Sequence, residues 1–243
     1  MDIASTLHGV THGSIAMTVS TSSLTRAAGV AAIAAGAIFI AVQINHPHLD
    51  VTSVTTTEVF IRNSLKVLMA ALALAGITGM YLSQVRRNGV LGLIGYLVLA
   101  TSYLLVLSTT FAATFVLPQI AGTDPGFVSD VIAVAKGGAA TGDIGALALV
   151  WRIQDLSYLA GGLIFGVALY RARVLPRWAS ALLALGGAIS FVLSVLPDAF
   201  YRLLAFPNGI AMIGLGYALW RIQRRAVAQT PGIPEARPDQ AAV

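Results

Sequence analysis

Six long apolar segments constrain this chain of 243 residues more than any other feature of its sequence. A membrane helix needs about 20 mostly apolar residues to cross a hydrocarbon core of about 30 Å. The segments are rich in Ala, Leu and Gly and do not alternate in polarity, so they favour helices over a closed barrel. The sequence predicts an all-α, polytopic membrane helical bundle with six transmembrane helices, at about residues 27–44, 65–83, 90–117, 151–170, 178–196 and 199–220.

The composition excludes several classes of protein. Charged residues make up only 10% of the chain, whereas a soluble domain carries about a quarter. The chain has no cysteine, which excludes disulfides, a thiolate nucleophile and cysteine metal ligands. In a membrane protein, the formal net charge of +5 indicates topology and contact with anionic lipid, and we expect no nucleic-acid partner.

The chain divides into a bundle and two tails. Residues 25–225 hold the six spans. Residues 1–24 are polar and rich in small residues, lack the basic start of a signal peptide, and are expected to be disordered. Residues 226–243 contain three prolines and alternating charges, and are expected to form a disordered cytoplasmic tail.

Charge sets the expected orientation. With six spans, ten of the 15 lysines and arginines fall on the side that holds both termini, and five on the other. The positive-inside rule then places the protein in the cell membrane with both termini in the cytoplasm. The longest connection, residues 119–150, becomes an outer loop between spans three and four. Whether residues 126–149 form a surface helix or a re-entrant one stays open.

A His-Pro-His sequence follows the first span and is the most ligand-like motif of the chain. His46 and His48 can point to one side of an extended segment, and Asp50 or Glu58 can add oxygen ligands for zinc. A catalytic zinc site usually has three protein ligands, and only two histidines lie here. A loop with its histidines at the headgroup interface is the competing interpretation. No cofactor is expected otherwise.

Polar residues also gather at the outer ends of spans two, four and six. Arg62 and Lys66 share a face at the start of a helix, where two cations oppose the helix dipole and need compensation from Glu58 or an anionic ligand. We predict an outer vestibule that binds a lipid or small amphiphile. Its candidate residues are Arg62, Asn63, Lys66, Arg152, Asp155, Asp198, Arg202 and Asn208.

Three members of this set have alternative roles. Arg152 and Asp155 are spaced to pair along a helix, and a buried Asp155 would suit proton transfer. Pro207 and Asn208 interrupt span six, where freed carbonyls could line a transport pathway. A local ion pair and a packing kink are the simpler interpretations.

Three short sequences carry a resemblance: Ser64-Leu-Lys66, Gly76-Ile-Thr-Gly79-Met-Tyr81, and Val174-Leu-Pro176-Arg177-Trp178-Ala179. With them, residues 26–225 or so resemble an uncharacterised family of bacterial multi-pass integral membrane proteins of unknown function. The resemblance implies residence in the bacterial inner membrane and transfers no functional residue.

The sequence favours a non-enzymatic bundle that binds lipid or acts as an accessory or scaffold subunit. An intramembrane metal-assisted hydrolase at His46 and His48 is one alternative, and a small transporter using the broken sixth helix is another. Membrane lipids are the expected partners. Gly162 and Gly166 form a GxxxG helix-contact pair that could join a second copy or another membrane subunit.

Overall fold

The computed structural model describes residues 20–193 and 205–228, and these residues are helical with no strand. The elements are α1 (Thr21–Ala41), η1 (Ser53–Thr55), α2 (Thr57–Leu82), α3 (Val85–Phe115), α4 (Leu117–Ile120), α5 (Pro125–Ala135), α6 (Leu147–Ala172), α7 (Arg177–Leu193) and α9 (Ala205–Ala228). Among the described residues, four segments are long and apolar enough to cross a membrane: α1, α2, α3 with its extension to Ile120, and α6. The predicted all-helical, membrane-like class is confirmed.

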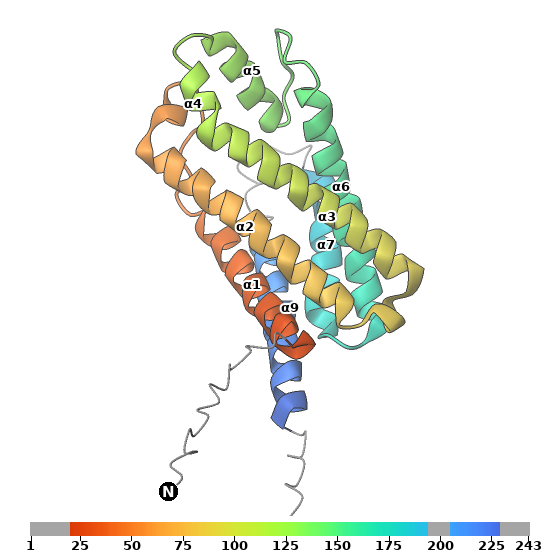
Figure 1. Cartoon of the computed structure of the whole chain (residues 1–243). Helices are drawn as coiled ribbons and strands as arrows, with labels where there is room; N and C mark the ends of the chain where they lie inside the picture. The colour runs from red at the N-terminus through yellow and green to blue at the C-terminus, as the bar shows by residue number, and fades with distance from the viewer. Residues whose placement is uncertain (1–19, 194–204, 229–243) are drawn as a thin grey trace, which may run out of the picture.

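The six long helices form a closed ring in which neighbours in sequence are neighbours in space. Each of α1, α2, α3, α6, α7 and α9 packs on the next, and α9 closes the ring by packing on α1 in the most extensive helix contact of all. Successive helices run in opposite directions. The start of α1, the α2–α3 turn, the α6–α7 turn and the end of α9 therefore lie at one end, which we call the basic end (Figure 1).

Backbones touch where α1 meets α9. A Cβ atom on Gly29 would lie 2.8 Å from the Gly216 carbonyl oxygen, and one on Gly216 would lie 2.6 Å from the Gly29 carbonyl oxygen. Gly36 and Gly209 repeat this reciprocal contact about two turns along. Only glycine permits such an approach, which compensates for the absence of a hydrophobic driving force between helices in lipid.

A polar contact deep in the bundle joins α3 to α6. Gln154 is 7% exposed, and its side-chain oxygen accepts a 2.8 Å hydrogen bond from the Thr109 hydroxyl. Its backbone carbonyl accepts another from the Ser102 hydroxyl at 3.0 Å. Around this contact the ring interior is filled with apolar side chains such as Met69, Phe165 and Leu215.

The opposite end of the bundle carries a cap built from η1, α4, α5 and the segment that leads into α6 (Figure 1). Asp124 begins α5 by accepting a hydrogen bond from the Phe127 amide at 2.9 Å, and Pro125 occupies the first helical position. A second apolar cluster, which includes Val54, Leu117 and Val128, packs beneath the cap. Of residues 126–149, those up to Ala135 belong to α5, and an irregular segment leads from there to the start of α6 at Leu147.

Four helices begin well before their predicted spans. α1 begins at Thr21, α2 at Thr57, α3 at Val85 and α6 at Leu147, whereas residues 27, 65, 90 and 151 were predicted. The first turns of α2 are polar, and the Thr56 side chain accepts a hydrogen bond from the Val59 amide, so this helix starts before its apolar segment.

Span six also differs from its prediction. Pro207 was expected to interrupt this span, but it lies in the first described turn of α9. The helix is continuous from Ala205 to Ala228.

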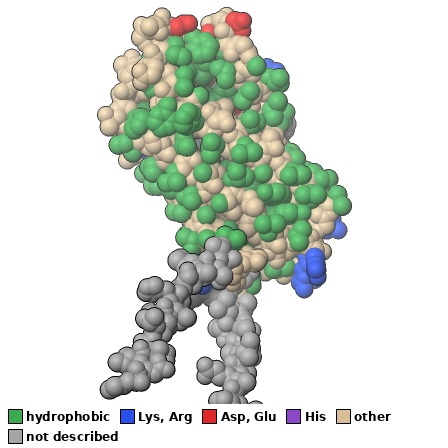
Figure 2. Space-filling model, viewed as in Figure 1, with side chains coloured by type: hydrophobic (Ala, Val, Ile, Leu, Met, Phe, Trp, Pro, Cys, Tyr) green, Lys and Arg blue, Asp and Glu red, His purple; other side chains and the backbone are tan. Residues whose placement is uncertain are grey.

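The surface has an apolar belt. Large hydrophobic side chains are exposed along the outward faces of the helices, among them Leu68, Leu97 and Leu156. Hydrophobic side chains are spread over the whole visible face in Figure 2, with acidic side chains at the cap and a group of basic ones near the opposite end. This is the distribution expected of a protein whose middle contacts lipid.

Candidate functional site

Arg62 ties the start of α2 to the end of α1. Its guanidinium donates hydrogen bonds to the backbone carbonyls of Val42, Ile44 and Asn45 at 3.2, 2.9 and 3.1 Å. It also pairs with Glu58 at 3.0 Å, one turn earlier on α2. The expected compensation for the cation thus comes from Glu58 and from carbonyls at the C-terminal end of α1, where the helix dipole favours positive charge.

Lys66 contacts His46 across the same loop. Lys66 Nζ lies 2.9 Å from His46 Nε2, and His46 Nδ1 lies 2.9 Å from the Pro47 carbonyl oxygen. A carbonyl only accepts, so Nδ1 carries the hydrogen, and Nε2 accepts from the Lys66 ammonium. This geometry fixes a neutral imidazole whose second nitrogen already has a partner.

The four predicted metal ligands do not gather into one site. Among the described residues, no three His, Asp or Glu side chains lie close enough together to hold a metal ion. Glu58 pairs with Arg62, and Asp50 instead accepts hydrogen bonds from the Thr52 and Ser53 amides at 2.9 and 2.7 Å. The Ser53 amide is the main reason that the pKa of Asp50 lies below its ordinary value. His48 is exposed.

The predicted vestibule residues are distributed over alternate members of the ring. Asn63 is buried on α2, whereas Arg152 and Asp155 are exposed on α6, with α3 between these helices. Among the described residues, Arg152 and Asp155 do not form an ion pair. Asn208 is 2% exposed and lies directly over Gly186 of α7. Asp198 and Arg202 lie outside the described residues.

The cap is held by its own hydrogen bonds. Asp130 of α5 accepts from the Thr141 amide at 2.9 Å, the Gly142 amide at 2.8 Å and the Thr141 hydroxyl at 2.9 Å. The Thr141 amide is the main cause of an Asp130 pKa below its usual value. Lys136 Nζ donates to the Leu49 carbonyl at 2.6 Å and so joins α5 to the α1–α2 loop.

We expect acid to weaken these hydrogen bonds and so to open the cap. Because the folded state lowers the pKa of Asp130 from 3.8, its stabilisation is complete well above pH 3.8 and is lost as the pH falls through the lower folded-state value. We expect the protection factors of the Thr141 and Gly142 amides against hydrogen exchange to fall below about pH 4, after correction for the intrinsic rate.

Asp130→Asn should abolish that protection already at pH 7. Asp143→Asn is the matched control, since Asp143 accepts only the nearby Gly145 amide, at 2.7 Å. Equal protection in wild type and Asp130→Asn would contradict this role of the carboxylate.

Gly162 and Gly166 serve a contact within the chain. A Cβ atom on Gly162 would lie 3.4 Å from Gly187 Cα, and one on Gly166 would lie 2.5 Å from the Ala184 amide nitrogen. This GxxxG pair packs α6 on α7. A second subunit, if present, would have to use another surface.

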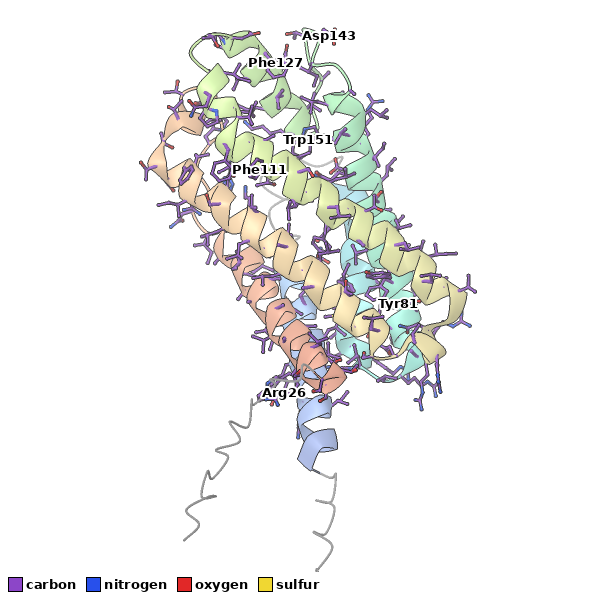
Figure 3. All side chains as sticks on the ribbon, in the orientation of Figure 1. Arg26, Tyr81, Phe111, Phe127, Asp143 and Trp151 are labelled. Atoms are coloured by element: carbon purple, nitrogen blue, oxygen red, sulfur yellow. The ribbon has the colours of Figure 1, made fainter. Side chains whose placement is uncertain are left out.

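Sequence reasoning overlooked a groove at the basic end. The groove has a volume of about 480 Å³ and lies between the α2–α3 turn and Val174 of the α6–α7 turn. The residues that line it include Gln84, Arg86 and Arg87. The available signal was four polar residues close together, Gln84, Arg86, Arg87 and Asn88, in a turn that needs only two or three. In Figure 3, the labelled Tyr81 marks this end of α2, far from Asp143 in the cap.

Comparisons of the chain with protein-family models, curated proteins and solved structures found no match.

Proposed function

We propose that this chain is an integral membrane protein that crosses the bilayer six times, with both termini in the cytoplasm, and that it holds a lipid or another small amphiphile without catalysing a reaction. The observation that carries the proposal is the apolar belt between two polar ends. Exposed side chains such as Leu97 and Leu104 on α3 would be costly in water and are favourable in lipid.

The ring supports the number of spans. α7 and α9 have 17 and 24 residues as described, and both pack alongside the four helices that are long and apolar enough to cross. A helix of 26 residues such as α2 is about 39 Å long, which exceeds a hydrocarbon core of about 30 Å. Six antiparallel helices in a ring return the chain to the side on which it began.

Charge supports the orientation. The arginines of the α2–α3 and α6–α7 turns and of the end of α9 lie at the basic end, and all described acids lie on the cap side of the bundle or in α6. Short arginine-rich turns are retained on the cytoplasmic side. The cap would then face outward.

Cysteine labelling tests the topology directly, because the natural chain has no cysteine. Arg26→Cys places a thiol at the basic end and Asp143→Cys places one in the cap, at opposite ends of the bundle in Figure 3. With a membrane-impermeant maleimide on intact cells, we expect Asp143→Cys to react and Arg26→Cys to react only after permeabilisation. Labelling of both thiols from outside, or of Arg26→Cys alone, would contradict the proposal.

The purified wild-type chain tests the lipid-holding role. We expect lipid from the host membrane to remain on the protein through detergent extraction, as adducts in native mass spectrometry at a constant ratio. A monodisperse chain that carries no lipid under gentle extraction would refute this part of the proposal.

A further inference from the structure

Two buried amide side chains at the basic end, that of Gln84, which lines the groove, and that of Asn88, have polar atoms without a hydrogen-bond partner among the described residues. Gln84 is 4% exposed, and its side-chain nitrogen donates to the Met80 carbonyl at 3.2 Å. Its side-chain oxygen is buried and accepts no hydrogen bond from the described residues. Asn88, one turn further on, is 5% exposed, and neither polar atom of its side chain has a partner within the described part of the chain. Buried polar atoms are almost always hydrogen-bonded, so an unpartnered pair beside a groove indicates a ligand.

The backbone also departs from a regular helix beside the groove. Gly89 has φ +57° and ψ −160°, which breaks the helical path of α3 directly after Asn88. The Arg87 and Asn88 amides both donate to the Gln84 carbonyl, at 2.9 and 3.0 Å, and so hold a short turn ahead of this break. The turn presents Arg86 and Arg87 on the surface while Gln84 and Asn88 stay inside.

Positive charge surrounds the groove without an acid to neutralise it. Arg86 and Arg87 line it, and a neighbouring depression that shares Val174 is lined by Arg221 of α9. No ion pair joins these three arginines to an acid among the described residues. The described turns and helix ends at the basic end of the bundle contain no Asp or Glu. A guanidinium pair of this kind suits a phosphate group.

The groove also borders the apolar belt. Leu82 is 62% exposed, Val85 44% and Val90 73%, all on or next to the same turn. An occupant that places its phosphate on Arg86 and Arg87 can therefore lay an apolar part along these side chains. The combination fits a phospholipid better than a soluble phosphate.

We infer that this groove binds the headgroup of an anionic phospholipid that bears free hydroxyl groups. The phosphate accepts from Arg86 and Arg87. When the Gln84 side chain turns into the groove, its oxygen accepts from a headgroup hydroxyl, a bond that a bare phosphate at neutral pH forms much less well. This assignment rests on the proposed membrane residence and lipid-holding role, and it names the lipid class and the site.

The test uses the full chain, stripped of lipid in detergent, and titration with defined lipids followed by native mass spectrometry. The probes are phosphatidylglycerol, phosphatidic acid, phosphatidylethanolamine and soluble glycerol 1-phosphate. We expect phosphatidylglycerol to bind about tenfold tighter than phosphatidylethanolamine and about fivefold tighter than phosphatidic acid. Glycerol 1-phosphate should not bind at millimolar concentration, and binding as tight as that of the lipid would overturn the lipid assignment.

Three variants separate the contributions. Gln84→Met keeps the size of the side chain but removes the acceptor, so phosphatidylglycerol should lose its preference over phosphatidic acid. Arg86→Gln with Arg87→Gln should weaken both anionic lipids about tenfold. Arg26→Gln, a single charge removed at the same end but outside the groove, should change binding less than about twofold.

Two results would overturn the inference. One is an equal loss of affinity for anionic lipid per charge removed in the Arg26 and Arg86/Arg87 variants, which would indicate nonspecific electrostatic attraction. The other is an unchanged lipid preference in Gln84→Met. If a variant does not fold, the wild-type chain still tests the inference, because phosphatidylglycerol must raise its melting temperature more than phosphatidic acid does. Cysteine labelling that places Arg26→Cys inside and Asp143→Cys outside, together with no lipid preference, would refute this inference and leave the proposed orientation intact.

Discussion

Replacing Gly36 with leucine is expected to prevent α1 from closing the ring. A Cβ atom at this position would meet the Gly209 carbonyl oxygen and would lie 2.9 Å from the Ile213 side chain. The obstacle on the α9 side includes backbone, which cannot rotate away as a side chain can. Overpacking against backbone should reach or exceed the upper end of the usual range, about 3 kcal/mol. Gly36→Leu should therefore give little monodisperse protein on size exclusion in detergent.

Ala37 supplies the matched control for this prediction. It is the next residue of α1 and is exposed, so Ala37→Leu adds the same side chain to the same helix on its outward face. That variant should elute and melt as wild type does. If Gly36→Leu also elutes and melts as wild type does, α1 and α9 do not pack backbone to backbone.

Replacing Arg62 with leucine should give the second largest loss of stability. The Glu58 pair contributes little by itself, because Glu58 is 58% exposed and such helix pairs are worth about 0.3–0.5 kcal/mol. The three carbonyls at the end of α1 matter more, because each loses a charged donor. We expect the free energy of unfolding to fall by about 2–3 kcal/mol, measured as a lower melting temperature in detergent.

Three further variants locate the source of that loss. Glu58→Gln should cost about 0.5 kcal/mol or less. Arg62→Lys should give an intermediate loss, since a lysine ammonium cannot present the planar fork that reaches several carbonyls. Arg152→Leu removes an arginine on the cap side of α6 that has no ion pair among the described residues, and should have little effect. A loss in Glu58→Gln equal to that in Arg62→Leu would assign the effect to the ion pair instead.

The helices could be predicted because hydropathy over some 20 residues reports directly on the solvent of a segment. The first turns of α2 were missed for the same reason. They are polar, and the helix begins there through the Thr56 cap rather than through apolar periodicity. The first turn of α6, Leu147 to Val150, is apolar, so hydropathy could have placed its start four residues earlier.

The contacts of the candidate site were harder to predict because its side chains bind backbone atoms. Nothing in the sequence shows that Arg62 reaches the carbonyls at the end of α1, or that Asp130 binds the amides of Thr141 and Gly142. The vestibule prediction placed residues correctly on α2 and α6, but it could not foresee that α3 lies between these two helices. Gln84 and Asn88 drew no attention because an amide in a turn looks ordinary until its burial is known.

The closure of the ring between α1 and α9 has a consequence for biogenesis. The ribosome delivers α1 to the membrane first and α9 last, so the helix that will bury the glycines of α1 arrives after every other helix. Until then, the Gly29 and Gly36 face of α1 stays open to lipid or to the insertion machinery. A nascent chain arrested before residue 205 should therefore be far more sensitive to membrane proteases than the finished one.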